Sequence, residues 1–263
     1  MLHRIPLDIV NQDISTFLTH EFTILLRQNY HFGCDWQGQE TVQILVQKAS
    51  GLFIWAATAC RFVREKRLLA SRRLSMLLGS GDSSTEPEGK LDEIYLTVLA
   101  NSVSSFTDEE KSFIYSMMRP ILESLAILFS PLSTTSLSAL LHIKNEDVTT
   151  ALEDLHAILD IPENPSHTLR LHHPSLRDFL LDKYRCSDPN FWVDERQAHR
   201  MLTDECIRLM SNSLKQDICG QQAPGTLMAE VEDCRIEQCL CNKTSANGQR
   251  LSRGQQERLQ YVR

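Results

Sequence analysis

The chain has 263 residues, of which 42% are hydrophobic and 23% charged, values typical of a packed globular protein rather than a disordered one. Its formal net charge of -7 argues against general binding to nucleic-acid phosphates. The most apolar run, 51–60, is about half as long as the roughly 20 residues of a membrane helix. The sequence therefore predicts a cytoplasmic protein with reduced cysteines and no membrane partner.

Apolar residues recur at helical spacing through the first hundred residues. They predict helices over 8–26, 40–48, 52–63 and 91–99. Gly51 is expected to end the second of these, because glycine readily adopts the positive φ found after helices. The loop over 79–89 is no phosphate-binding loop, since Gly89 and Lys90 are followed by leucine and not by serine or threonine.

A basic run follows the third predicted helix. Its members are Arg61, Arg64, Lys66, Arg67, Arg72 and Arg73, and Glu65 interrupts them. We interpret the run as a solvated helix face, with a nucleic-acid or lipid patch as the alternative. The cluster of Cys234, Cys239 and Cys241 lacks both C-x-x-C spacing and a nearby histidine, so no metal site is predicted there.

The next stretch has the order helix, helix, helix, hairpin. Thr107 and Glu110 have capping-box spacing and begin a helix in which Pro120 predicts a kink or break. Further helices are predicted from Ser133 and from Asn145 as caps, followed by a hairpin over 159–173 and a short helix over 175–184. This order predicts a winged-helix domain. Residues 198–209 predict another helix, and 220–263 are expected to be disordered.

The expected fold class is therefore mainly α: a helical bundle, then a winged-helix domain with one small β-hairpin, a further helix and a disordered tail. Winged helices commonly bind DNA, which gives a second hypothesis. The candidate recognition helix carries Glu146, Asp147, Glu153 and Asp154 and has no lysine or arginine. Phosphates would repel such a face, so no nucleic-acid partner is predicted.

Two adjacent histidines end the predicted hairpin. Strand alternation places His173 inward with Leu169 and Leu171, and His172 toward water. Pro174 is expected to hold His173 extended. The residues alone favour a core histidine that hydrogen-bonds the backbone.

Several spaced segments resemble one family. GLFIWAATACRF, FSPLSTTSLSALL, LHAILDIPEN, LHHPSLRDFLLDKYRC, FWVDERQAHR and LKQDICG are similar to the fungal NACHT-type signal-transduction NTPases, which are STAND or NLR-like proteins related to vegetative incompatibility proteins. The resemblance implies the C-terminal edge of a nucleotide-binding core at 1–38, a helical domain at 39–104 and a winged helix at 105–185. It also implies the start of a second helical domain at 190–219, before the polar tail at 220–263.

The resemblance further implies a role for His173 and for the chain. In the family, the equivalent histidine of the HPSLRDF motif contacts the β-phosphate of ADP and holds the resting state closed. Because the P-loop is missing, the chain is expected to be no enzyme and to bind no cofactor alone, although full-length members bind ADP or ATP with Mg. The expected partners are the nucleotide-binding core and repeat domains of the same or a related chain, with oligomers possible. A free-standing protein-interaction module is the remaining alternative.

Overall fold

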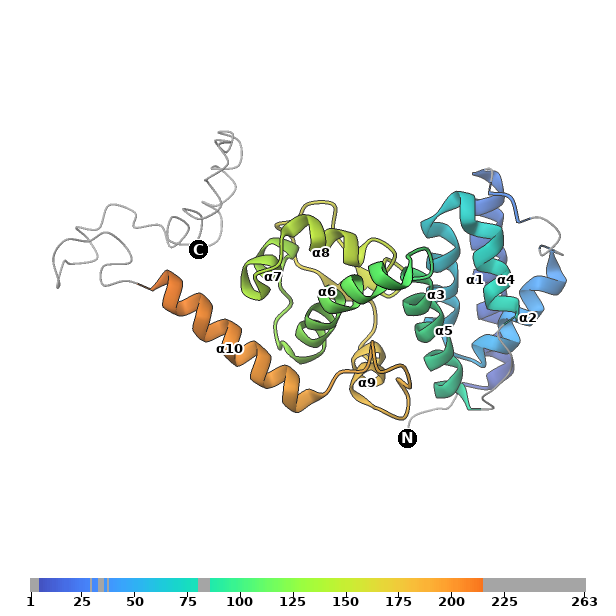
Figure 1. Ribbon diagram of the computed structural model, residues 1–263. Helices are drawn as coiled ribbons and strands as arrows, with labels where there is room; N and C mark the ends of the chain where they lie inside the picture. Colours follow the sequence, from blue (N-terminus) through green and yellow to red (C-terminus); the bar gives the residue numbers. More distant parts are fainter. Residues whose placement is uncertain (1–4, 29, 33–35, 37, 80–85, 215–263) are drawn as a thin grey trace, which may run out of the picture. The chain divides into compact units, whose positions relative to one another are not determined.

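The computed structural model describes residues 5–28, 30–32, 36, 38–79 and 86–214. The chain divides into two units, Met1–Ile207 and Arg208–Arg263, and of the second only the first residues, 208–214, are described. The described part is mainly helical and has a single two-stranded sheet (Figure 1). The coarse class predicted from the sequence is confirmed, whereas the winged-helix assignment stays a prediction.

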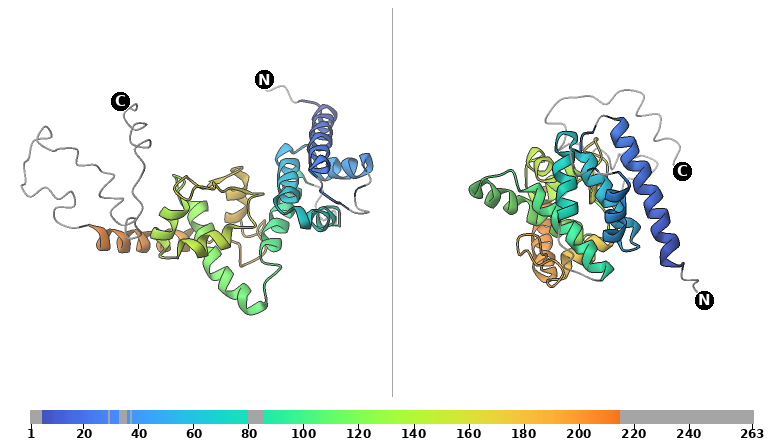
Figure 2. Two further views of the ribbon diagram at one scale, coloured as in Figure 1. Left: turned by 90° about the horizontal axis from the view of Figure 1, so that it is seen from above. Right: turned by 90° about the vertical axis from the view of Figure 1, so that its right-hand side faces the viewer.

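Five helices form the first group of packed elements. They are α1 (Leu7–Arg27), α2 (Gln39–Ala49), α3 (Phe53–Glu65), α4 (Ala70–Gly79) and α5 (Pro87–Ser102), with a 3₁₀ turn at Arg67–Leu69 between α3 and α4. Helix α3 contacts α1, α2, α4 and α5, which explains why its sequence is apolar on nearly every side. Figure 2 shows α1 along the outside of this group. The four predicted helices of this region are confirmed.

Helix α1 shares the apolar core of this group. Its Ile14, Leu18, Phe22 and Leu25 are buried, at the spacing that the sequence predicted. The proposed domain boundary after residue 38 stays a prediction, but α1 packs directly on α2 and α3. Gly51 has a φ of 78°, as expected, and the helix cap itself is Ser50, which is also left-handed.

The second group of elements follows α5. It contains α6 (Asp108–Ile127), α7 (Thr134–Leu141), α8 (Asn145–Leu152), β1 (Leu159–Asp160), β2 (Arg170–Leu171) and α9 (Ser175–Leu181). The capping box of Thr107 and Glu110 is present in both directions. Helix α6 continues through Pro120, so of the predicted kink or break the break is wrong, and the kink stays a prediction. Pro120 lacks an N–H, but its carbonyl still accepts a hydrogen bond from Ser124 Oγ at 2.7 Å.

The helix caps after α6 confirm one prediction and correct another. Ser133 caps α7 through its side chain, which accepts a hydrogen bond from the backbone of Ser136. Asn145, by contrast, is the first residue of α8, and Lys144 stands at the cap without a side-chain bond. The hairpin is antiparallel as predicted, with Leu159 opposite Leu171 and Asp160 opposite Arg170.

The last described helix is α10 (Glu195–Ser213). Its Ala198 and Leu202 are buried, whereas Cys206, placed on the same inward face by the sequence prediction, is exposed. The inward face therefore ends earlier than its period suggested. The predicted tail at 220–263 and the three cysteines within it lie outside the described residues. Across the described ranges, no helix combines the length and the apolar character that a membrane crossing requires.

Candidate functional site

The candidate site lies where the hairpin and the start of α9 meet the first group of helices. His173 Nδ1 is 2.7 Å from Ser175 Oγ and also accepts a hydrogen bond from the Ser175 backbone N–H at 3.2 Å. The same Ser175 hydroxyl is 2.8 Å from the Tyr95 hydroxyl of α5. A chain of hydrogen bonds thus connects α5 to the histidine that the sequence singled out.

The tautomer of the His173 ring can be assigned from this network. Because a backbone N–H can only donate, Nδ1 must be the unprotonated acceptor, and the proton of the neutral ring is on Nε2. Ser175 Oγ then donates to Nδ1, and the Tyr95 hydroxyl donates to Ser175. Burial raises the pKa of Tyr95, which keeps this donor protonated. The ring is half-buried, and Nε2–H is its remaining donor.

His172 differs from its sequence prediction. It was expected to face water, but it is half-buried, and its Nε2 lies 3.1 Å from the carbonyl oxygen of His156. Burial, together with the nearby Arg61 cation, lowers the pKa of His172. The strand rule fails here because β2 is only two residues long and ends before the histidines.

A buried group of charges lies beside this network. Arg73 is 1% exposed, and its Nη1 lies 2.5 Å from Glu65 Oε2 while its Nη2 lies 3.1 Å from Asp154 Oδ1. The guanidinium also donates to the Phe62 carbonyl at 2.7 Å and stacks 4.7 Å from the centre of the Phe62 ring. We call Glu65, Lys66, Arg73 and Asp154 the charge cluster. It joins helices α3 and α4 to the segment that follows α8.

Two further contacts complete the charge cluster. Lys66 Nζ lies 2.7 Å from Asp154 Oδ1, and Glu65 Oε1 accepts the backbone N–H of His156 at 2.9 Å. Burial raises the pKa of Glu65, and the Arg73 charge opposes that shift. Pairing with Arg73 and the hydrogen bond from the His156 N–H both favour the ionised carboxylate against its burial.

Asp92 and Arg185 form a second ionic contact in the same unit. Arg185 Nε lies 3.0 Å from Asp92 Oδ2, and Nη2 lies 2.8 Å from Oδ1. This two-pronged geometry is the stronger form of an arginine–carboxylate pair. It links α5 to the segment after α9, next to Tyr95. We use the term junction for three contacts together: the charge cluster, the Tyr95–Ser175–His173 chain and the Asp92–Arg185 pair.

The basic run fits its interpretation as a solvated face only in part: Arg64, Arg67 and Arg72 are exposed, whereas Arg73 is buried and the others are half-buried. Arg73 and Lys66 belong to the charge cluster, Arg64 pairs with Glu21, and Arg61 Nη1 donates to the Ala157 carbonyl at 3.4 Å. These cations are therefore mostly used within the fold. Glu65, interpreted as an interruption of the run, is a partner inside it.

The structure places His173 at the junction. It was the single site residue predicted from the sequence, so the other residues of the junction were not anticipated as site residues. Sequence reasoning missed Tyr95, Arg73 and Asp92, because a tyrosine or charge on a helix is ordinary until its distant partner is known. One available signal was a carboxylate, Glu65, inside a basic run on an apolar helix. Within the described ranges, no group of three or more histidine, cysteine or acidic side chains could hold a metal ion.

The exposed face of α8 is acidic, as the sequence predicted. Glu146 is exposed on it. Just after the helix, Glu153 is exposed and lies 3.6 Å from Lys66 Nζ, while Asp154 turns into the charge cluster. Comparison of the chain with protein-family models, with curated proteins and with solved structures gives no match.

Proposed function

We propose that this chain is the regulatory helical and winged-helix part of a NACHT-type nucleotide-dependent signalling switch that acts in the cytoplasm. Support comes from the sequence motifs and from the order of the elements, a helical group followed by three helices, a hairpin and a short helix. The observation that carries the proposal is the fixed ring of His173. Its Nδ1 is held by Ser175, so that Nε2–H is the donor.

This arrangement suits a contact to ADP. A β-phosphate oxygen accepts hydrogen bonds and cannot donate when ionised, so a ring presented with Nε2–H is complementary to it. The chain's own residues supply positioning: Tyr95 orders Ser175, and Ser175 orders the imidazole. The remaining phosphate contacts belong to the nucleotide-binding core expected in the full-length family.

Binding of ADP therefore requires that core. A hydrogen bond to a charged group contributes about 1.5–3 kcal/mol, whereas micromolar affinity needs about 8 kcal/mol. The chain alone is expected to show neither ATPase activity nor measurable ADP binding.

The junction fits the regulatory role. Two groups of helices connected by ion pairs and hydrogen bonds can separate, because water or a partner can replace those contacts. The free-energy difference between the closed and the open state is then modest. In the proposed closed state, His173 would add a further link between the winged helix and the nucleotide. Loss of that link would favour the open, oligomerising state.

The test is ADP release from this chain assembled with the nucleotide-binding core of a fungal NACHT protein. His173→Ala should raise the ADP release rate roughly 10- to 150-fold, because it removes about 1.5–3 kcal/mol from the closed state. Ser175→Ala should raise it less, since the ring and the backbone N–H that donates to Nδ1 are kept and only the hydroxyl contact is lost. His167→Ala, in the exposed turn of the hairpin, is the matched control and should leave release unchanged. Equal rates for the His173 and His167 variants would refute the proposal.

The DNA-binding alternative has no comparable support. The exposed face of the candidate recognition helix presents Glu146 and Glu153, and phosphates would repel both. A duplex-DNA shift assay at low salt should show no complex.

A further inference from the structure

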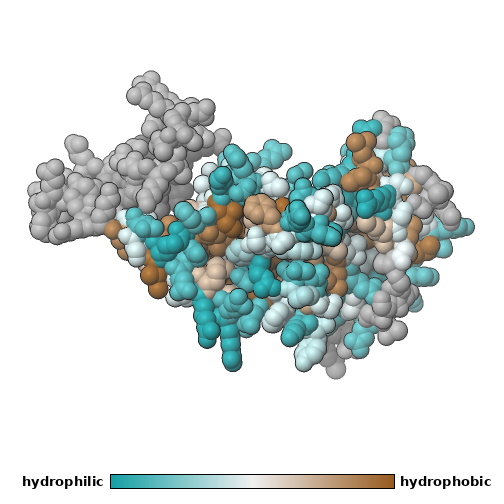
Figure 3. Space-filling model, viewed as in Figure 1, coloured by the Kyte–Doolittle hydropathy of each residue, from teal (hydrophilic) through white to brown (hydrophobic). Residues whose placement is uncertain are grey.

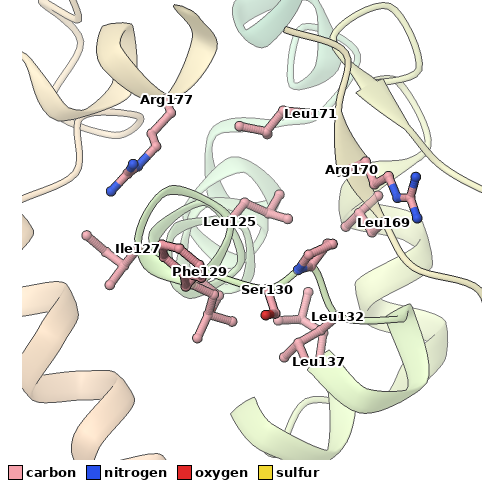
Figure 4. Close-up of a pocket in the computed structure, with 13 residues that line it drawn as sticks. Leu125, Ile127, Phe129, Ser130, Leu132, Leu137, Leu169, Arg170, Leu171 and Arg177 are labelled. Atoms are coloured by element: carbon pink, nitrogen blue, oxygen red, sulfur yellow. The ribbon is translucent and has the colours of Figure 1, made fainter. Parts of the chain in front are cut away.

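A groove on the second group of helices has no role in the proposed switch. It has a volume of about 330 Å³ and lies between the end of α6, the segment that leads to α7, strand β2 and α9. That size is at the lower end of the range for ligand-binding pockets. Figure 4 shows Leu125 and Leu171 pointing into this space, with Leu132 and Leu137 at one end. We call it the α6–β2 groove.

One arginine gives the groove its charge. Arg177 extends from α9 along the side of the groove next to Ile127, and its Nε donates to the Ala126 carbonyl (Figure 4). It makes no ion pair with any residue in the described ranges. Of the described residues that line the groove, none is acidic, although the chain as a whole carries a net charge of -7. The Arg170 head points away from the space.

A strand edge gives the groove its second polar feature. The backbone N–H of His172 donates to Ile158, and that of Leu169 donates to Leu132 on the opposite side. By the alternation of an antiparallel ladder, the Leu171 N–H and C=O point away from β1, toward the groove. Leu171 has no hydrogen-bond partner on that side within the described part of the chain. Among the described residues, the segment before α7 pairs with the two residues that precede β2, through the Ser133–Thr168 bridge and the Leu169 N–H to Leu132. It also contains Pro131, which has no N–H to offer.

An aromatic side chain stands at the edge of the groove. Phe129 lines it and is fully exposed, which is unusual for a phenylalanine beside a hollow apolar surface. Figure 3 shows apolar side chains reaching the surface over α7, on a face that is otherwise largely hydrophilic. Exposed aromatics at the edge of an apolar groove are typical anchors of protein interfaces.

We propose that the α6–β2 groove binds an extended segment of a partner protein that carries apolar side chains and a carboxylate. The apolar side chains enter beside Leu125 and Leu171, and the carboxylate pairs with Arg177. The partner's backbone forms hydrogen bonds with the Leu171 N–H and C=O, as a strand added to the sheet edge would. The need for hydrogen bonds to the Leu171 backbone favours a peptide over a fatty acid, because a fatty acid could contact only the apolar lining and the arginine.

The experiment uses the full chain and fluorescent peptides in which leucine, isoleucine or phenylalanine alternates with aspartate, measured by polarisation. Saturable binding of at least one peptide is expected. Replacing aspartate by lysine, or methylating the peptide nitrogens, should weaken binding about tenfold or more, because each change removes one required contact. Dodecanoate should compete poorly.

Variants test whether binding occurs in this groove. Phe129→Ala and Arg177→Gln should each weaken binding about tenfold, whereas Arg177→Lys should retain most of it because the charge remains. Phe113→Ala and Arg72→Gln are matched controls, since both residues are exposed and neither lines the groove. Thermal unfolding of each variant separates lost binding from lost folding. Absence of saturable peptide binding, equal binding of the lysine peptides, equal loss in the controls, or tight dodecanoate binding without peptide binding would each overturn the proposal.

Discussion

The interior of the first group of helices and the junction stabilise the molecule by different means. Inside α1–α5, apolar faces pack at helical spacing, and Leu18, Leu45 and Phe62 are completely buried. At the junction the contacts are ionic or hydrogen-bonded, and they are concentrated on a few side chains such as Arg73 and Tyr95. Both regions lie within the same unit of the chain.

The difference shows which region can change state. Apolar packing is non-directional and roughly proportional to area, so it resists separation but specifies geometry weakly. Buried ion pairs and hydrogen-bond chains contribute less net free energy, yet they fail sharply when one member is lost or changes protonation. A region built in the second way is suited to a closed state that opens on a signal. Three experiments test this difference.

The largest effect is expected from Arg73→Ala. The substitution leaves Glu65 and Asp154 facing each other in a buried site without the arginine, and breaking a buried pair costs about 3–5 kcal/mol. Since domains are typically stable by about 5–15 kcal/mol, much of the total would be lost. Urea unfolding measures the change in the free energy of unfolding.

Two controls connect this result to the comparison. Arg72→Ala, at the exposed neighbouring position, should change stability by less than about 0.5 kcal/mol. The double variant Arg73→Met with Glu65→Met should recover part of the loss, because the buried Glu65 charge is removed and Asp154 keeps Lys66 as its partner. Full recovery is not expected, since the His156 N–H loses its acceptor. If Arg73→Ala were as stable as wild type, the charge cluster would be dispensable for stability.

An intermediate effect is expected from Tyr95→Phe. The ring keeps its contact with Phe179, at 5.5 Å between centroids, and only the hydroxyl that donates to Ser175 is removed. A single hydrogen bond contributes about 0.5–1.5 kcal/mol, so unfolding should become easier by about 1 kcal/mol. Ser175→Ala in the same background should add less than it does alone, since both changes break one chain.

Nitrogen NMR of the His173 ring provides the second measurement for this network. The wild-type ring should show the tautomer protonated on Nε2, and Ser175→Ala should keep that tautomer because the backbone N–H at this position still donates to Nδ1. Strictly additive stability losses, or a wild-type ring protonated on Nδ1, would contradict the hydrogen-bond assignment.

Much of the fold could be predicted because its signals are local. The apolar period located α1, α2, α3 and α5, and the Thr107–Glu110 spacing located the start of α6. The failures also have local causes. Helix α6 tolerates Pro120 because burial on its other residues outweighs one missing N–H, and Asn145 is not a cap although its type favours that position.

The junction could not be predicted, because its partners are far apart in the sequence. Arg73 and Asp154 are separated by 81 positions, and Tyr95 and Ser175 by 80. No periodicity encodes such pairs, so the sequence showed a basic run and an acidic helix as separate surface features. His173 was singled out by its position after the hairpin and by family resemblance, but the tautomer follows only from the contact with Ser175.

The smallest effect concerns the pH dependence contributed by His172. Its pKa in the folded chain is lowered from 6.5, first by burial and then by Arg61, while the His156 carbonyl and Asp160 oppose the shift. The unfolded chain therefore binds a proton more readily than the folded chain does. Stability from the neutral imidazole is present above the unfolded pKa and is lost as pH falls through the folded pKa. Wild type should lose stability on acidification from about pH 7 to pH 5, within the range where histidine titrates.

His172→Gln isolates that contribution. Glutamine can still donate to the His156 carbonyl but never becomes charged, so the stability advantage of wild type over this variant should shrink as pH falls. His167→Gln, in the exposed hairpin turn, should leave the pH slope unchanged and controls for the loss of any titrating histidine. Because His172 remains partly accessible to water, the change in slope should be small compared with the loss on Arg73→Ala. A wild-type advantage that grows on acidification would mean that protonated His172 stabilises the folded chain, contrary to the direction of its pKa shift.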